Sequence, residues 1–154
     1  MQAPTPTVRS AGADDIPALV DFNRRMAMET EDKQLDADIL TSGVGAVLDD
    51  PRRGFYLIAE VDGQIAGALM VTTEWSDWRD GDFWWVQSVY VKHEFRRRGV
   101  FRALYQETRQ LAKDTPRVRG CRLYVDRHNA TAQATYAKLG LVETDYKMLE
   151  EVFP

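Results

Sequence analysis

The chain has 154 residues, of which 44% are hydrophobic and 29% are charged, and its formal net charge is −4. This length and balance predict one globular domain over residues 1–154, with enough apolar side chains to form a core. The apolar runs are too short to cross a bilayer, and the N-terminus lacks the pattern of a secretory signal. We therefore expect no membrane partner. The single cysteine, Cys121, suits a reducing compartment, so the expected location is cytoplasmic.

Charges are unevenly distributed along the chain. Residues 29–50 hold seven acids and one base, whereas residues 92–102 hold five bases and one acid. Such clusters are typical of two solvated faces, but they also suit a protein that binds an anion at one place and a cation at another. The acidic net charge argues against nucleic acid as a partner.

The spacing of apolar residues changes from helical to extended in the first half of the chain. We expect an edge strand at 7–11, a helix from the N-cap Asp14 or Asp15 to about Met28, and a second helix at 35–48. We then expect a strand at 54–61, a hairpin turn at Asp62-Gly63, a strand at 64–74 and a loop at 75–82.

The second half alternates strands with helices. Expected are a central strand at 83–91, a helix at 100–114, a strand at 121–125, a short helix at 129–138 with Asn129 as its N-cap and Gly140 as its terminator, and a final strand at 141–149. The order β-α-α-β-β-β-α-β-α-β predicts a mixed α/β (α+β) sheet.

Two motifs in this half resemble those of the GNAT-type acyl-CoA N-acyltransferases. The first is Val89-Tyr90-Val91 followed by the turn Arg96-Arg97-Arg98-Gly99-Val100-Phe101, and the second is the Asn129–Gly140 segment with Tyr136. Phe101 departs from the family pattern, which more often has Gly or Ala there, but its side chain can point into the core. The resemblance implies a GNAT-like fold, with a central mixed sheet of six to seven strands and about four helices.

The resemblance implies acetyl-CoA as co-substrate. Backbone N–H groups of the turn and the start of the following helix can bind its pyrophosphate, and Gly99 permits unusual backbone angles. The arginines of the turn add positive charge. By the same resemblance, Val89, Tyr90 and Val91 lend backbone groups to the acetyl and pantetheine parts, and Asn129 bonds the pantetheine arm or simply caps its helix.

The expected activity is acetyl transfer to a primary amine by direct attack. Position within the motif makes Tyr136 the candidate general acid for the departing thiolate. The general base is open, because the central strand at 83–91 carries no carboxylate at its family position. Candidates are Glu29, Glu31 and Asp77, a water chain, or bulk solvent. No His or Cys pattern supports a metal site.

The acceptor amine is expected between the first two helices and the 75–82 loop. Trp75, Trp78, Trp84 and Trp85 could form the walls of this pocket, and Glu29, Glu31 and Asp77 could hold a cation. It is a small molecule or a protein amine. Two other functions stay open, namely a non-catalytic acyl-CoA-binding regulatory module and an RNA-phosphate binder. Sheet edges and the C-terminal strand are candidate contacts for a homodimer.

Overall fold

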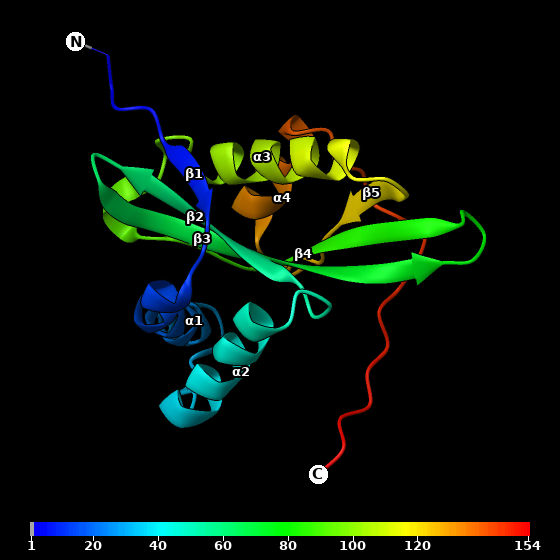
Figure 1. Cartoon of the computed structure of the whole chain (residues 1–154), viewed down its shortest axis with the longest axis horizontal. Helices are drawn as coiled ribbons and strands as arrows, with labels where there is room; N and C mark the ends of the chain where they lie inside the picture. The colour runs from blue at the N-terminus through cyan, green and yellow to red at the C-terminus, as the bar shows by residue number, and fades with distance from the viewer. Residues whose placement is uncertain (1) are drawn as a thin grey trace. The chain divides into compact units, whose positions relative to one another are not determined.

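A five-stranded sheet forms the centre of the larger part of the computed structural model, which describes residues 2–154 (Figure 1). The described residues form two compact units, one ending at Leu123 and one spanning Tyr124–Pro154. The elements of the larger unit are β1 (Thr7–Ser10), α1 (Ile16–Glu31), α2 (Ala37–Asp49), β2 (Phe55–Val61), β3 (Gln64–Ser76), β4 (Gly81–Val91), α3 (Val100–Asp114) and β5 (Val118–Arg122), with 3-10 turns at Ala13–Asp15 and His93–Phe95.

The strands lie in the order β1-β2-β3-β4-β5. Neighbours are antiparallel except β4 and β5, which are parallel and are joined through α3. Figure 1 shows α1 and α2 on one face of this sheet and α3 on the other. Helices therefore cover both faces of the central strands, which explains why β2 is almost entirely buried.

The core lies on both sides of the sheet. On one side Leu19 and Phe22 of α1 and Val44 of α2 pack against Ile58 and Tyr90. On the other side Val100, Leu104 and Thr108 of α3 are buried at 0–2% exposure, a spacing of four residues that places them on one face of the helix. The buried side chains of α1 and α2 and those of α3 thus pack on the sheet.

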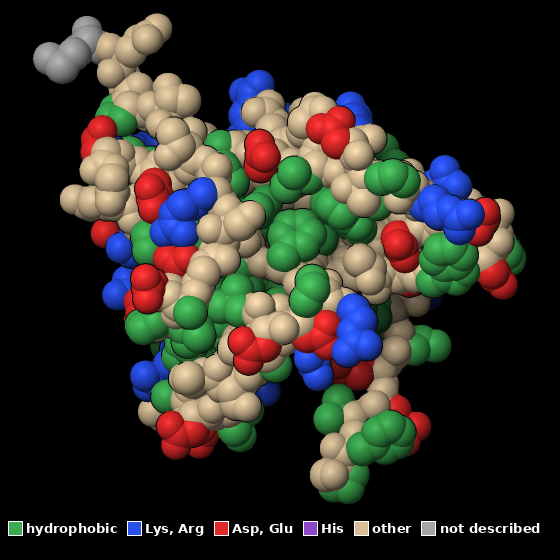
Figure 2. Space-filling view, in the orientation of Figure 1, with side chains coloured by type: hydrophobic (Ala, Val, Ile, Leu, Met, Phe, Trp, Pro, Cys, Tyr) green, Lys and Arg blue, Asp and Glu red, His purple; other side chains and the backbone are tan. Residues whose placement is uncertain are grey.

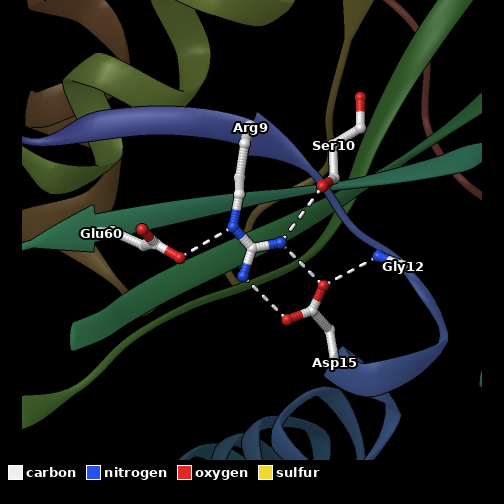
Figure 3. A network of polar contacts seen from close by, with 5 residues as sticks. All are labelled: Arg9, Ser10, Gly12, Asp15 and Glu60. Atoms are coloured by element: carbon white, nitrogen blue, oxygen red, sulfur yellow. Dashed lines mark hydrogen bonds and ion pairs between the residues drawn. The ribbon is translucent and has the colours of Figure 1, made fainter. Parts of the chain in front are cut away.

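Arg9 fixes the start of α1 to the sheet (Figure 3). Its guanidinium donates to both carboxylate oxygens of Asp15, at 2.8 and 2.9 Å, and to Glu60 of β2 at 2.7 Å. Asp15 also accepts the Gly12 N–H at 2.8 Å. The Arg9 hydrogen bond lowers the pKa of Asp15. Asp15 precedes α1 as predicted, but its carboxylate binds Arg9 and Gly12 rather than the N–H groups of the helix.

The smaller unit contains the predicted short helix. α4 spans Ala130–Lys138, and the Asn129 side chain caps it by accepting the Ala132 N–H at 3.0 Å. Gly140 follows with a φ of +96°, in the left-handed region expected of a residue that terminates a helix. Residues 141–154 form neither helix nor strand.

The predicted final strand at 141–149 is wrong, and so is the predicted count of six to seven strands, because residues 2–154 contain five. The segment has the alternation of a strand, but a strand forms only where a neighbour accepts its backbone hydrogen bonds. Helix number and the order of the other elements agree with the prediction.

Two other boundaries differ from the prediction. Half of the predicted loop at 75–82 is strand, because Trp75 pairs with Asp82 and Ser76 with Gly81 across a long β3–β4 hairpin, and residues 77–80 form its turn. β5 begins at Val118 rather than at residue 121, since its register is set by pairing with β4. Among residues 2–154 no helix is long and apolar enough to cross a membrane.

Candidate functional site

β4 carries a bulge near its C-terminal end. Gln87 pairs with Met70 and Tyr90 pairs with Ala68, so Ser88 and Val89 together oppose the single residue Leu69. Ser88 has a φ of +50°, in the left-handed region that non-glycine residues rarely occupy. A bulge leaves its extra residue out of the strand ladder and re-aims the neighbouring backbone groups. Strain of this kind is often kept where function needs it.

β4 and β5 diverge at this same end of the sheet. Their pairing runs from Asp82–Val118 to Trp85–Arg122. β5 then ends, whereas β4 continues through the bulge to Val91. Within the described chain, the β5 side of residues 86–91 therefore has no strand partner.

A turn with left-handed residues leads from β4 into α3. Arg97 has a φ of +64° and Gly99 a φ of +75°, and residues 96–99 are exposed. A Cβ at Gly99 would meet nothing within 4 Å, so the space in front of the turn is open and the left-handed φ explains the glycine. The first hydrogen bond of α3 runs from the Ala103 N–H to the Gly99 carbonyl.

The start of α3 has the properties of an anion site. The N–H groups of Val100 and Arg102 precede the first helical hydrogen bond, and the positive end of a 15-residue helix lies behind them. Phe101 does not cover this turn, because its ring stacks on Tyr105 one helical turn later, with ring centroids 6.0 Å apart. The phosphate-binding role predicted for this turn stays a prediction, with which its geometry is compatible.

Gly67 of β3 packs closely against β4 and the first residue of α3. A Cβ at this position would lie 2.6 Å from the Tyr90 carbonyl oxygen, 3.2 Å from Val100 Cγ1 and 3.3 Å from Val91 Cα. Gly67 thus allows the close approach of β3, β4 and the first residue of α3. The sequence offered no signal for this role, since a glycine within a strand has several possible reasons.

Glu29 joins α1 to this end of β4. Its carboxylate accepts the Tyr90 hydroxyl at 2.7 Å and Arg96 Nη2 at 2.7 Å. Arg96 also donates through Nε to the Val91 carbonyl at 2.9 Å and lies over the Tyr90 ring. The hydrogen bonds from Arg96 and Tyr90 lower the pKa of Glu29, so its carboxylate is ionised at neutral pH. Burial has the larger effect on the Tyr90 hydroxyl and raises its pKa. The hydrogen bond to Glu29 raises this pKa further.

These contacts give the three arginines of the turn different roles. Arg96 pairs with Glu29 and is thereby directed toward α1. Arg98 lies over the Phe95 ring, 5.7 Å from its centroid. Arg97 and Arg98 are both exposed.

A hollow of about 560 Å³ lies beside Glu29. Its walls are α1 side chains between Asp21 and Glu29, together with Gln34 and Leu35 of the link to α2. Acidic and basic groups both line it, since Arg24 and Arg25 face it as well. The hollow is open to solvent and is adjacent to the carboxylate that contacts β4.

The structure does not bring the three predicted acids together. Glu31 is the exposed last residue of α1, and Asp77 lies in the exposed turn between β3 and β4. Tyr90, the partner of Glu29, is eight residues along β4 from Asp82, or about 25 Å at the usual rise of a strand. Asp77 therefore lies far from Glu29.

The four tryptophans do not line a common pocket. Trp75 and Trp78 are exposed in the β3–β4 hairpin, at 55% and 86%. Trp84 is buried against Phe55, and the Trp85 indole N–H donates to Glu74 at 3.4 Å. The expectation that they line the acceptor pocket beside the first two helices is thus wrong.

Tyr136 and Asn129 belong to the smaller unit. Burial raises the pKa of the Tyr136 phenol, which therefore keeps its proton at neutral pH. Asn129 has the capping role that was one of its two predicted roles. No group of three or more metal-ligating side chains occurs among residues 2–154.

The chain is similar to proteins of an acetyltransferase family. Residues 17–141 match the model of the acetyltransferase (GNAT) family. The structure of a possible acetyltransferase from Clostridium difficile 630 is 42% identical, with a TM-score of 0.89 over 97% of this chain and 98% of that one. No curated protein matches the chain.

Two more distant structures share the fold. A predicted acetyltransferase from Clostridium acetobutylicum, solved with acetyl-CoA, is 18% identical with a TM-score of 0.77, over 96% of each chain. An aminoglycoside acetyltransferase from an uncultured soil metagenomic sample, solved with sisomicin, is 13% identical with a TM-score of 0.77, over 97% of each chain.

Proposed function

We propose, since the chain belongs to the acetyltransferase (GNAT) family, that it transfers an acetyl group from acetyl-CoA to a primary amine by direct attack. The observation that carries this proposal is the conjunction of the β4 bulge at Ser88, the divergence of β4 from β5, and the open left-handed turn before α3. Backbone groups without a strand partner and the N-terminal start of α3 thus lie at one end of one sheet, which supports the proposal.

The residues of this end fit the parts of acetyl-CoA. The N–H groups at the start of α3 and the side chains of Arg97 and Arg98 would hold the pyrophosphate. Backbone groups of residues 89–91 would hold the pantetheine arm, which is extended and polar. When bound, the co-substrate supplies an acetyl group activated as a thioester.

Two groups of this chain would stabilise the negative charges that develop on the carbonyl oxygen and on the sulfur during acetyl transfer. The Val89 N–H would polarise the thioester carbonyl, as an oxyanion-hole donor does. Tyr136 would give its phenol proton to the sulfur as the C–S bond breaks and the C–N bond forms. The raised pKa of Tyr136 suits this role, because the phenol stays protonated over the neutral range.

Glu29 is the acid that we assign to the amine, in preference to the distant Asp77 and the exposed Glu31. An open hollow lies beside its carboxylate, which is ionised and would attract an ammonium group. A carboxylate of lowered pKa holds a cation well and keeps a proton poorly. The amine proton would therefore pass by way of Glu29 or a water to solvent.

An assay of thiol release tests this function. Acetyl-CoA is incubated with the full chain and a panel of amines comprising a polyamine, sisomicin and a lysine-containing peptide. We expect free thiol to appear in equal amount with the acetylated product for one class of amine. Titration calorimetry with acetyl-CoA alone measures binding separately.

The same pair of measurements distinguishes the second candidate function. A regulatory module that only binds acyl-CoA would give a calorimetric signal and release no thiol above the buffer rate with any amine. The lack of a carboxylate from Phe83 to Val91 of β4 is the observation that favours this alternative.

A further inference from the structure

The hollow beside Glu29 combines charges of both signs with apolar surface. Its charged lining consists of two acids and two bases, which are Asp21, Glu29, Arg24 and Arg25, so their formal charges cancel. Met28, which is 48% exposed, adds apolar surface to the same wall. Figure 2 shows basic and acidic side chains together in the region of α1 and α2. A hollow of this composition is complementary to a ligand that carries both charges itself.

Two of the four charged side chains neutralise each other. Arg25 Nε lies 2.9 Å from a carboxylate oxygen of Asp21, one helical turn earlier on α1. The charges that this pair leaves for a ligand are those of Arg24 and Glu29.

Arg24 is an exposed cation on the wall of the hollow. Within residues 2–154 no acid forms an ion pair with it, and its guanidinium makes no hydrogen bond to another side chain. A guanidinium presents a planar fork of N–H donors that matches the oxygens of a carboxylate or a phosphate. Arg24 therefore supplies the positive charge that an anionic group of the ligand requires.

Glu29 supplies the opposite charge at the same hollow. Its side chain is 44% exposed, and Tyr90 and Arg96 each donate a hydrogen bond to one of its two carboxylate oxygens. A carboxylate has about four acceptor sites, so these two bonds leave room for the donors of an ammonium group.

The positions of Arg24 and Glu29 on α1 indicate how far apart the two charges of the ligand lie. Five residues correspond to about 7.5 Å along the axis of a helix. Met28 comes between them in the sequence, and Leu35 of the link to α2 lines the same hollow. An aliphatic chain that joins the two charged groups would contact these two apolar side chains.

We propose that the hollow binds an amphoteric amine, with its ammonium group on Glu29, a carboxylate or phosphate on Arg24, and an aliphatic chain between them. This inference rests on the proposed acetyl transfer, for which it names the class of acceptor amine. A polyamine is less favoured, because a second ammonium group would lie near Arg24. An α-amino acid is less favoured too, because its two charged groups are adjacent and would not reach both side chains.

Calorimetric titration of the full chain in the presence of coenzyme A tests the proposal without turnover. The probes are hexylamine, ε-aminocaproate and aminohexyl phosphate, which share an aliphatic chain and differ in the anionic group. We expect at least one anionic probe to bind about fivefold more tightly than hexylamine. The tighter of the two anionic probes then shows whether the anion is a carboxylate or a phosphate.

Two variants show whether Arg24 causes this preference. In Arg24→Gln the anionic probes should bind no more tightly than hexylamine. Arg52→Gln removes the same charge from an exposed arginine outside the hollow and should keep the preference. The proposal would be overturned by equal binding of all three probes to the unchanged chain, by a preference that survives in Arg24→Gln, or by the binding of none.

Thiol release from acetyl-CoA with the same probes separates this inference from the proposed function. If hexylamine is acetylated with the same kcat/KM as both anionic probes, acetyl transfer stands and the inference is overturned. If an anionic probe binds through Arg24 but neither it nor any amine of the wider panel releases thiol, acetyl transfer is contradicted and the assignment of the hollow stands.

Discussion

Replacing Tyr136 by phenylalanine is expected to lower kcat by about 10²–10⁴-fold, the usual contribution of a positioned general acid. The affinity for acetyl-CoA should stay unchanged, because the substitution removes one hydroxyl and keeps the ring. Without that hydroxyl the departing thiolate must take its proton from water. Steady-state thiol release measures kcat, and calorimetric titration with acetyl-CoA measures the affinity.

Tyr146→Phe is the matched control for this prediction. It makes the same chemical change at an exposed tyrosine of the same unit, and its turnover should equal that of the unchanged chain. The role assigned to Tyr136 would be wrong if Tyr136→Phe released thiol at the original rate. A parallel loss in both variants would point to a change in the unit rather than to acid catalysis.

The second large effect is expected from Gly67→Ala. The added methyl would lie 2.6 Å from the Tyr90 carbonyl oxygen, which is backbone and cannot rotate away. Overpacking of this kind lowers the free energy of unfolding by about 1–3 kcal/mol. It should also separate the β4 bulge from the start of α3 and weaken coenzyme A binding. Urea unfolding and calorimetry measure the two effects.

Gly43→Ala is the control for that substitution. Gly43 lies within α2, and a Cβ there would meet nothing within 4 Å. Alanine favours a helix over glycine by about 1 kcal/mol, so this variant should be as stable as the original chain or slightly more stable. If Gly67→Ala were as stable as Gly43→Ala, the close approach inferred at Gly67 would be wrong.

Local patterns in the sequence predict most of the elements. The apolar spacing predicts α1, α2 and α3, and Asp62-Gly63 predicts the β2–β3 turn, where both residues have positive φ as that turn requires. The errors occur where pairing decides the outcome. The pattern of residues 141–149 is that of a strand, but pattern alone does not supply the neighbour on which a strand depends.

The candidate site could be predicted only in part. The turn before α3 has a local signature, and the structure places left-handed residues and a helix start there, which are features that suit an anion. Glu29 could be named as an acid near a helix end, but its partners Tyr90 and Arg96 are 61 and 67 residues away in the sequence. Ser88 carries no signal of a bulge, because glycine is the usual residue at a left-handed position.

Hydrogen exchange of the full chain with and without coenzyme A tests most directly whether the bulge of β4 and the turn before α3 form one binding site. We predict that coenzyme A slows exchange at residues 89–91 and at residues 97–102, and leaves the β3–β4 turn at residues 77–80 unchanged. Coenzyme A that binds without slowing exchange in either of the first two segments would contradict the account.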